Sequence, residues 1–325
     1  MQFDKISKFL KYNILGSFVI LKKIFNLLFI RKKLDIIKEN KKLQKKFEID
    51  INDYKRCSQI YSSIIIDIIP EENVSTRLIN ISDENRKFID VYIFKETMTY
   101  DESRKCRDFA FKIMKDEYKI NRKKLYLNKE ENKNKFIKIK INYQIKSFKD
   151  LFAECKLRTI IFKKFYRTNI IDMKGMFKKC FYLKDLIFKQ FNTENVTDLS
   201  FMFSRCIFLR EVNVSSFNTN NVVDMRKMFS GCTSLQKLDL SNFNTSKVTN
   251  MEEMFYECSS LKELNLINFD TRNVVCIDHM FAFCIQLKTL KIKKIDMNKI
   301  DKINGITVNC IDEIKNLIKF FIYSN

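Results

Sequence analysis

The sequence predicts an α/β fold, a solenoid of stacked repeats in which parallel short strands alternate with short helices. The segments 224–249 and 250–275 are each 26 residues long and are identical at 12 of their 26 positions. A Met-Phe pair recurs at the same period, at Met176-Phe177, Met202-Phe203, Met228-Phe229, Met254-Phe255 and Met280-Phe281. Self-similarity at a period of about 20 to 50 residues is typical of repeats that stack on one another. With a degenerate earlier copy at Leu151-Phe152, we expect five to six coils of this length.

Each repeat contains two apolar periodicities. In the repeat 250–275, four residues have the spacing of one face of a short helix: Met251, Met254, Phe255 and Cys258. Leu264 and Leu266 then flank Asn265, and this alternation is typical of a short strand. The polar stretch 268–273 predicts a turn toward the next repeat. We therefore expect each repeat to contain a strand, a turn, a short helix and a second turn.

The segments on either side of the repeats do not share their period. Apolar runs at 60–69 and 88–94 predict buried strands, and the alternation over 136–145 predicts a half-buried strand. The flanks are assigned as caps, because the end repeats of a solenoid must be covered. We predict four parts: a helical segment over 1–50, an α+β cap over 51–146, the solenoid over 147–295 and a C-terminal helical cap over 296–325.

Six of the ten cysteines recur at the repeat period: Cys155, Cys180, Cys206, Cys232, Cys258 and Cys284. Metal sites use closely spaced Cys or His residues, whereas this chain has no C-x-x-C motif and His279 is its single histidine. Free cysteine is among the most buried residue types, so we expect a column of buried thiols and neither a metal nor a cofactor. Reduced thiols favour a cytoplasmic location, with the cell surface or secretion as the alternative.

The net charge of +22 is concentrated outside the repeats. Residues 1–50 and 121–149 each carry a net charge of +8, whereas residues 172–275 carry only +1. Binding of nucleic acid needs a concentrated basic face, so we do not expect nucleic acid as a partner of the repeats. Residues 14–47 combine apolar and basic side chains at near-helical spacing. This pattern predicts a helix that packs on the protein, contacts a membrane surface or docks a partner.

No motif of an enzyme active site is present in the sequence. The chain lacks a glycine-rich phosphate loop, H-E-x-x-H and G-x-S-x-G. His279 occupies a repeat position that other repeats fill with Gly175, Phe201, Lys227 or Glu253, which indicates a surface residue. We therefore expect no enzymatic activity and no small-molecule substrate.

Consecutive repeats contain L-x-x-L-x-L, at Leu235-Leu238-Leu240 and Leu261-Leu264-Leu266. This motif is the core of a leucine-rich repeat. The fuller pattern M-x-x-M-F-x-x-C-x-x-L-x-x-L-x-L-x-x-F-x-T-x-x-V, over residues 147–295, resembles the BspA-like leucine-rich repeats of mycoplasma lipoproteins and protist families. The resemblance implies a curved parallel-strand solenoid used for protein recognition or adhesion, without enzyme activity. The N-terminal helical segment resembles the F-box module that tethers leucine-rich repeats to ubiquitin ligases.

The predicted binding surface consists of the exposed strand positions that flank the buried leucines. They form rows of mixed charge on the concave strand face: Arg210, Glu211, Asn213, Gln236, Lys237, Asp239, Lys262, Glu263, Asn265, Lys288 and Lys291. Such a polar surface suits a protein epitope better than a small-molecule pocket. We therefore expect a non-enzymatic protein-interaction scaffold, with a cell-surface adhesin and a ubiquitin-ligase adaptor as alternatives.

Overall fold

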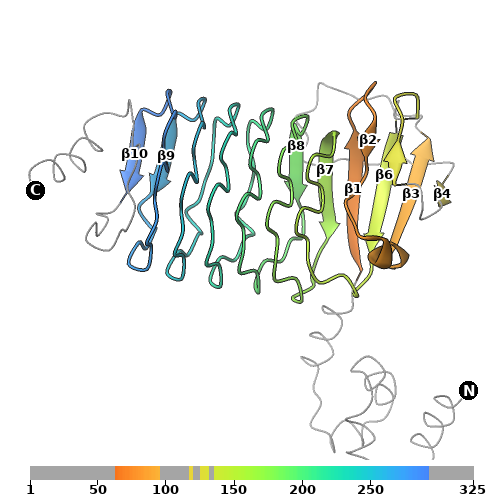
Figure 1. Cartoon of the computed structure of the whole chain (residues 1–325), viewed down its shortest axis with the longest axis horizontal. Coiled ribbons are helices and arrows are strands. Elements are labelled where there is room, and N and C mark those ends of the chain that lie inside the picture. Colours follow the sequence, from red (N-terminus) through yellow and green to blue (C-terminus); the bar gives the residue numbers. More distant parts are fainter. Residues whose placement is uncertain (1–62, 96–116, 120–124, 132–134, 293–325) are drawn as a thin grey trace, which may run out of the picture. The chain divides into compact units, whose positions relative to one another are not determined.

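The computed structural model describes residues 63–95, 117–119, 125–131 and 135–292 (Figure 1). These residues form strands and turns almost throughout. The single helix among them is the short 3-10 helix η1 (Asp83–Phe88). The helical segment predicted over 1–50, which includes the amphipathic stretch 14–47, lies outside the described residues. The same is true of the C-terminal helical cap predicted over 296–325.

A six-stranded mixed sheet begins the described chain. Its strand order is β4-β3-β6-β1-β7-β8, with these bounds: β1 (Ile64–Pro70), β3 (Ile89–Lys95), β4 (Glu117–Lys119), β6 (Lys135–Ile141), β7 (Leu157–Lys164) and β8 (Asp185–Phe188). Neighbouring strands are antiparallel except β7 and β8, which run parallel. A separate antiparallel pair consists of β2 (Thr76–Arg77) and β5 (Tyr126–Leu127). The strands predicted at 60–69, 88–94 and 136–145 are confirmed as β1, β3 and β6.

β7 connects this sheet to the repeats. It pairs antiparallel with β1 on one side and parallel with β8 on the other. β1 is a central strand, and its alternate residues Ile64, Ile66 and Ile68 are fully buried. Alternate residues of a strand lie on one face, so this face of β1 is covered, whereas Ile65 and Ile69 on the other face are partly buried.

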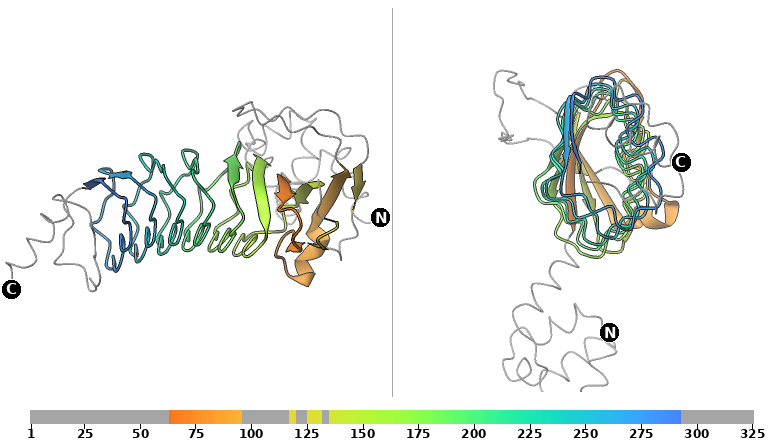
Figure 2. Two further views of the ribbon diagram at one scale, coloured as in Figure 1. Left: turned by 90° about the horizontal axis from the view of Figure 1, so that it is seen from above. Right: turned by 90° about the vertical axis from the view of Figure 1, so that its left-hand side faces the viewer.

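From β7 to β10 the repeats lie side by side, each displaced from the last by one period (Figures 1 and 2). Isolated parallel bridges join equivalent residues of neighbouring repeats, such as Asp198 to Asp224 and Asp224 to Asn250. β9 (Glu263–Leu266) and β10 (Thr289–Ile292) form a parallel pair one period apart. The parallel strands predicted in the repeats are thus present at β8, β9 and β10. Between β8 and β9 the pairing of these positions is reduced to a bridge from Glu211 to Lys237.

The prediction of a short helix in each repeat is wrong. Residues 251–258 show what replaces it: two consecutive turns, the first closed by a hydrogen bond of 3.2 Å from the Met254 N–H to the Met251 carbonyl. The predicted helical face is buried as expected, but Glu253 (φ 50°) and Glu257 (φ 57°) adopt left-handed conformations. A left-handed residue cannot continue a right-handed α-helix.

The neighbouring repeat explains why turns form instead of a helix. Alternate N–H groups of one repeat donate to carbonyl groups of the next, at 2.7–3.0 Å: Met225 to Asn250, Lys227 to Glu252, Phe229 to Met254 and Gly231 to Tyr256. An α-helix would use these N–H groups internally, bonding each to the carbonyl four residues earlier. Here the stacked neighbour supplies the acceptors, so the extended and turned backbone satisfies its polar groups without a helix.

The core is a set of columns that run through the repeats. Six phenylalanines stack with centroids 5.2–5.9 Å apart and rings within 14° of parallel: Phe152, Phe177, Phe203, Phe229, Phe255 and Phe281. A second stack consists of Phe191, Phe217 and Phe243. Each buried aromatic ring contributes about 1.5–3 kcal/mol relative to its exposure. One repeat could not bury these rings alone, so stability depends on the stacking of neighbours.

No helix within the described part of the chain is long and apolar enough to cross a membrane.

Candidate functional site

All eleven residues of the predicted binding surface are exposed, and stacking arranges them in rows. The first row is held by backbone hydrogen bonds between neighbouring repeats, from the Gln236 N–H to the Arg210 carbonyl (2.9 Å) and from the Lys288 N–H to the Lys262 carbonyl (2.8 Å). The second row contains Glu211, paired with Lys237. Neighbouring members of a row are about 4.8 Å apart, the spacing of paired strands.

The first row is basic and extends beyond the predicted residues. Its members are Arg158, Lys184, Arg210, Gln236, Lys262 and Lys288, joined at the start by a hydrogen bond of 2.9 Å from the Lys184 N–H to the Arg158 carbonyl. The second row is mainly acidic: Asp185, Glu211, Lys237 and Glu263. Two adjacent rows of opposite charge therefore run across the repeats. The sequence prediction included only part of each row.

Buried side chains fix where these rows lie. Leu264 is 2 % exposed and pairs with Leu290 on the next repeat, which is 4 % exposed. Asn265 and Lys291 are paired in the same register and point to solvent. Successive side chains of a strand point to opposite faces, so the residues next to the buried leucines are exposed.

Three predicted binding residues also have a structural role, which the sequence prediction missed. The side-chain oxygens of Asn213, Asp239 and Asn265 accept the backbone N–H two residues further on, at 2.9–3.1 Å. The N–H of Ser241 holds the pKa of the Asp239 carboxyl below its usual value. Such Asx turns explain why Asn or Asp recurs at this position. Their recurrence between the alternating apolar residues, as at Asn265 within β9, was the available sequence signal.

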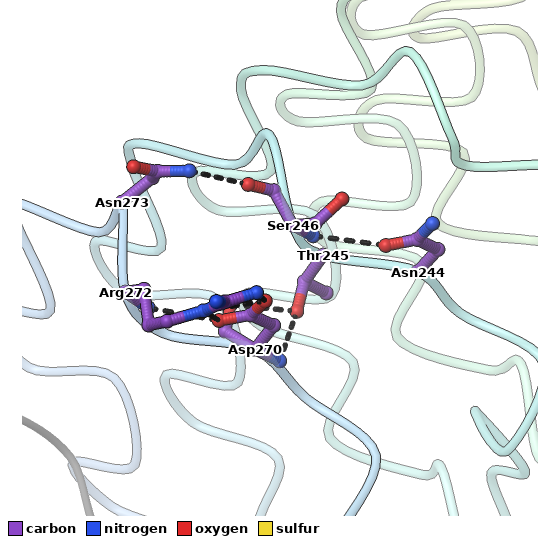
Figure 3. A network of polar contacts seen from close by, with 6 residues as sticks. All are labelled: Asn244, Thr245, Ser246, Asp270, Arg272 and Asn273. Atoms are coloured by element: carbon purple, nitrogen blue, oxygen red, sulfur yellow. Dashed lines mark hydrogen bonds and ion pairs between the residues drawn. The ribbon is translucent and has the colours of Figure 1, made fainter.

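The turns at the other end of the strand segment hold the repeats in register (Figure 3). The Thr245 hydroxyl accepts the N–H of Asp270 (2.7 Å) and donates to the Asp270 carbonyl (2.9 Å). The Asn273 amide donates to the Ser246 carbonyl at 2.6 Å, and Arg272 forms an ion pair with Asp270. These polar side chains are occupied with the neighbouring repeat and with their own turn, which makes this part of the surface structural.

The repeat position of His279 is a left-handed backbone position. Its φ is 54°, and the equivalent residues Gly175, Phe201, Lys227 and Glu253 have φ between 50° and 59°. His279 is partly exposed, in accord with the predicted surface position. The varied residue types at this position therefore share a backbone conformation and no common side-chain chemistry.

Phe201 occupies this position among cations from the two neighbouring repeats. Four positive groups lie 5.2–5.8 Å from the centroid of its ring: Lys174, Lys178, Arg226 and Lys227. Lys227 also forms ion pairs of 3.2 Å with both Glu252 and Glu253. Aromatic rings attract cations through the negative charge of their faces. A charged and aromatic surface that the sequence prediction did not identify therefore lies on the turns.

Asp67 is the fully buried carboxylate of the N-terminal sheet. It lies on β1 and forms an ion pair with Lys163 of β7. Burial raises the pKa of Asp67, and Lys163 counteracts part of that effect. The pair joins two adjacent strands inside the fold, so we assign it a structural role.

The recurring cysteines form the predicted column of buried thiols. Burial raises the pKa of Cys155 and of Cys232 to about 12, so neither is a thiolate at neutral pH. Across the residues that the structure describes, no group of three or more His, Cys, Asp or Glu side chains is placed to hold a metal ion.

Comparison with known proteins identifies one family. No curated protein and no solved structure gives a significant match to this chain. The family described as "Mycoplasma protein of unknown function, DUF285" matches twice, over residues 146–239 and 231–319. The two matches overlap and together span residues 146–319, more than half of the 325 residues. The chain is therefore a repeat protein that belongs to the DUF285 family.

Proposed function

We propose that this protein is a non-enzymatic scaffold that binds a protein partner through its strand face. We further propose that the repeats form a leucine-rich-repeat solenoid of the BspA-like type, with the strands on its concave side. The parallel pairing of β9 with β10 and the bridges between equivalent residues support this assignment. So does the burial of the leucines in L-x-x-L-x-L, such as Leu261, Leu264 and Leu266.

The two charged rows carry the proposal. Among the described residues, no carboxylate forms an ion pair with Arg210, Lys262 or Lys288, although the acidic row lies beside them. Charges that are left without a partner inside the molecule are available to a complementary surface. A protein with parallel acidic and basic ridges fits both rows, whereas a polyanion would meet repulsion from Glu211 and Glu263.

We place the protein in the cytoplasm, because the six recurring cysteines of its repeats are buried and form no disulfide. The segment that resembles an F-box lies outside the described residues, and no described feature favours the ubiquitin-ligase adaptor. No described feature favours the adhesin either.

The test is affinity capture with the full chain, followed by quantitative mass spectrometry. The variant Arg210→Glu/Lys262→Glu reverses two charges of the basic row, and Lys247→Glu makes the same change at an exposed site outside the rows. We expect the partner bound by the wild type to be lost at least 10-fold with the double variant and retained with the control. Equal capture by all three proteins, at equal Tm, would exclude the strand face as the binding surface.

A further inference from the structure

Along the turns of the regular repeats the charge changes sign, from basic in the earlier repeats to acidic in the later ones. The turn that precedes them, 147–155, is of mixed charge, with Lys149, Asp150 and Glu154. We define the turn face as the segments 172–180, 198–206, 224–232, 250–258 and 276–284. The first three segments contain six basic residues: Lys174, Lys178, Lys179, Arg205, Arg226 and Lys227. The last two segments contain four acidic residues and neither Lys nor Arg: Glu252, Glu253, Glu257 and Asp278. All ten of these side chains are partly or fully exposed.

Three aspartates within the basic end are turned toward the backbone. The carboxylates of Asp172, Asp198 and Asp224 each accept the N–H two residues further on, at 2.8–2.9 Å. Burial raises the pKa of Asp224, and the neighbouring Asp198 adds to that effect. Asp224 also pairs with Arg226, and Lys179 pairs with Glu154 of the preceding repeat. Lys174, Lys178 and Arg205 are therefore the basic residues of this end that form no ion pair with a described residue.

Each end also presents an aromatic group. At the basic end Phe201 is partly exposed, and Lys174 and Lys178 beside it form no ion pair with any described residue. At the acidic end Tyr256 and Phe283 pack edge to face with centroids 5.3 Å apart, and the Phe283 side chain is 53 % exposed. Aromatic residues and arginine are enriched in protein interfaces, and polar groups form the rim around them.

We propose that the turn face is a self-association surface that takes a second copy of this chain. A two-fold axis that lies in the plane of contact, perpendicular to the stack and between its basic and acidic ends, places the basic end of each copy opposite the acidic end of the other. The contact is then made twice, as in any isologous dimer. Lys174, Lys178 and Arg205 would face the carboxylates and aromatic rings near Glu257 and Asp278, where cation–π contacts add to charge attraction.

The distribution of charge favours a second copy over another occupant. An acidic peptide or a nucleic acid would be attracted to the basic end but repelled by the four carboxylates of the acidic end. Only a surface with the reverse order of charge matches both ends, and the turn face of another copy has that order. This surface is distinct from the charged rows of the strands, so both can be occupied at once.

The test measures the mass of the full chain by light scattering and sedimentation, at about 50 mM and about 500 mM salt. We expect a dimer at low salt that dissociates at high salt, because screening shortens the range of surface charges to a few ångströms. Lys174→Glu/Lys178→Glu reverses two charges at the basic end, and Glu257→Lys/Asp278→Lys reverses two charges at the acidic end. Each variant alone should weaken dimerisation by about 100-fold, since like charges then meet. Glu252 and Glu253 are left unchanged because they pair with Lys227 inside the molecule.

Mixing the two variants provides the decisive measurement. At both contacts the reversed charges of one variant face opposite charges on the other, so an equimolar mixture should recover a dimer that contains one copy of each. Lys262→Glu, a charge reversal on the strand face, should dimerise like the wild type, and Tm should confirm that all variants are folded. A wild type that is monomeric at low salt would overturn the proposal, as would variants that bind no better together than alone. Loss of an acidic peptide or RNA by the first variant, with the wild type monomeric, would assign the face to that ligand instead.

Discussion

The thiol of Cys232 donates a hydrogen bond of 3.1 Å to the carbonyl oxygen of Phe203, which lies one repeat earlier. That carbonyl also accepts the N–H of Cys206 at 3.0 Å, so two donors share it. The relationship recurs along the stack at 3.0–3.3 Å, from Cys180 to Phe152, Cys206 to Phe177, Cys258 to Phe229 and Cys284 to Phe255. Cysteine suits this position because it is small, apolar and still a weak donor.

The buried thiols should make the fold sensitive to alkali. The pKa of Cys232 is about 12 in the fold, against about 8.5 in the unfolded chain. Between these values the folded state binds more protons than the unfolded state, so the free energy of unfolding falls as pH rises. Each thiol contributes a slope of about 1.4 kcal/mol per pH unit in that window. We expect Cys232→Ala to remove one such slope, measured by urea unfolding at pH 8 and pH 10.

The control for this measurement is Cys276→Ala, at a partly exposed thiol outside the buried column. Its pH slope should stay closer to that of the wild type than the slope of Cys232→Ala. Parallel slopes for the wild type and Cys232→Ala would mean that this thiol ionises in the folded protein.

Gly231→Ala should destabilise the fold. Gly231 has φ +74°, and an added Cβ would lie 2.9 Å from Cγ of Arg205 on the preceding repeat. Left-handed backbone and a crowded neighbour both disfavour a side chain here, so we expect a loss of about 1–2 kcal/mol in the free energy of unfolding. Glu257→Ala is the matched control, because Glu257 already carries a Cβ at the equivalent position with φ 57°. Equal effects of the two substitutions would contradict this reading of Gly231.

Asp239 should matter for stability and not for partner binding. Its carboxylate accepts the Ser241 N–H at 2.9 Å and closes an Asx turn. We expect Asp239→Ala to lower the free energy of unfolding by about 1 kcal/mol, and Asp239→Asn to keep most of the turn. Because its pKa is lowered in the fold, the charged form is stabilised above the unfolded pKa, and this contribution is lost as pH falls. Loss of partner capture by Asp239→Asn at unchanged Tm would contradict this prediction and show that Asp239 takes part in binding.

The repeat period predicted which residues are buried better than it predicted their secondary structure. Met251, Met254, Phe255 and Cys258 are fully buried, although no helix contains them. Spacing of three and four residues is produced by two successive turns as well as by a helix. The deciding interactions are backbone hydrogen bonds to a repeat 25 residues away, such as Phe229 to Met254. The spacing of apolar residues within one repeat gives no information on hydrogen bonds to another repeat.

The exposure of the surface residues was also easier to predict than the role of each of them. All eleven predicted surface residues are exposed, because they alternate with leucines whose burial the L-x-L pattern indicates. The pattern could not separate the rows that present free charge, such as Arg210 and Lys262, from Asn213 and Asn265, whose side chains close turns. The turn face went unnoticed because its basic and acidic residues lie one to four repeats apart, and only stacking brings them onto one surface.

Arg167 differs in residue type from the residues at the same position of the later repeats. Its equivalents Thr193, Thr219 and Thr245 are buried and bond to the next repeat through their hydroxyls. Arg167 is fully buried and donates from Nη1 to the Asn142 carbonyl at 2.8 Å, but its Nε and Nη2 have no hydrogen-bond partner within the described ranges. Burial lowers the pKa of its guanidinium to about 10, which reflects the cost of placing a charge there.

Arg167→Met should therefore stabilise the protein. Methionine fills much of the same volume without a charge, and replacing buried charged groups by apolar ones of similar size gains about 1–4 kcal/mol in favourable cases. Loss of the hydrogen bond to Asn142 offsets about 1 kcal/mol of that gain. We expect a higher Tm for Arg167→Met in thermal unfolding, and no change for Arg210→Met, whose guanidinium is exposed. A Tm below that of the wild type would show that the buried charge has a partner beyond Asn142, and would make Arg167 a point where the repeats are joined to another part of the chain.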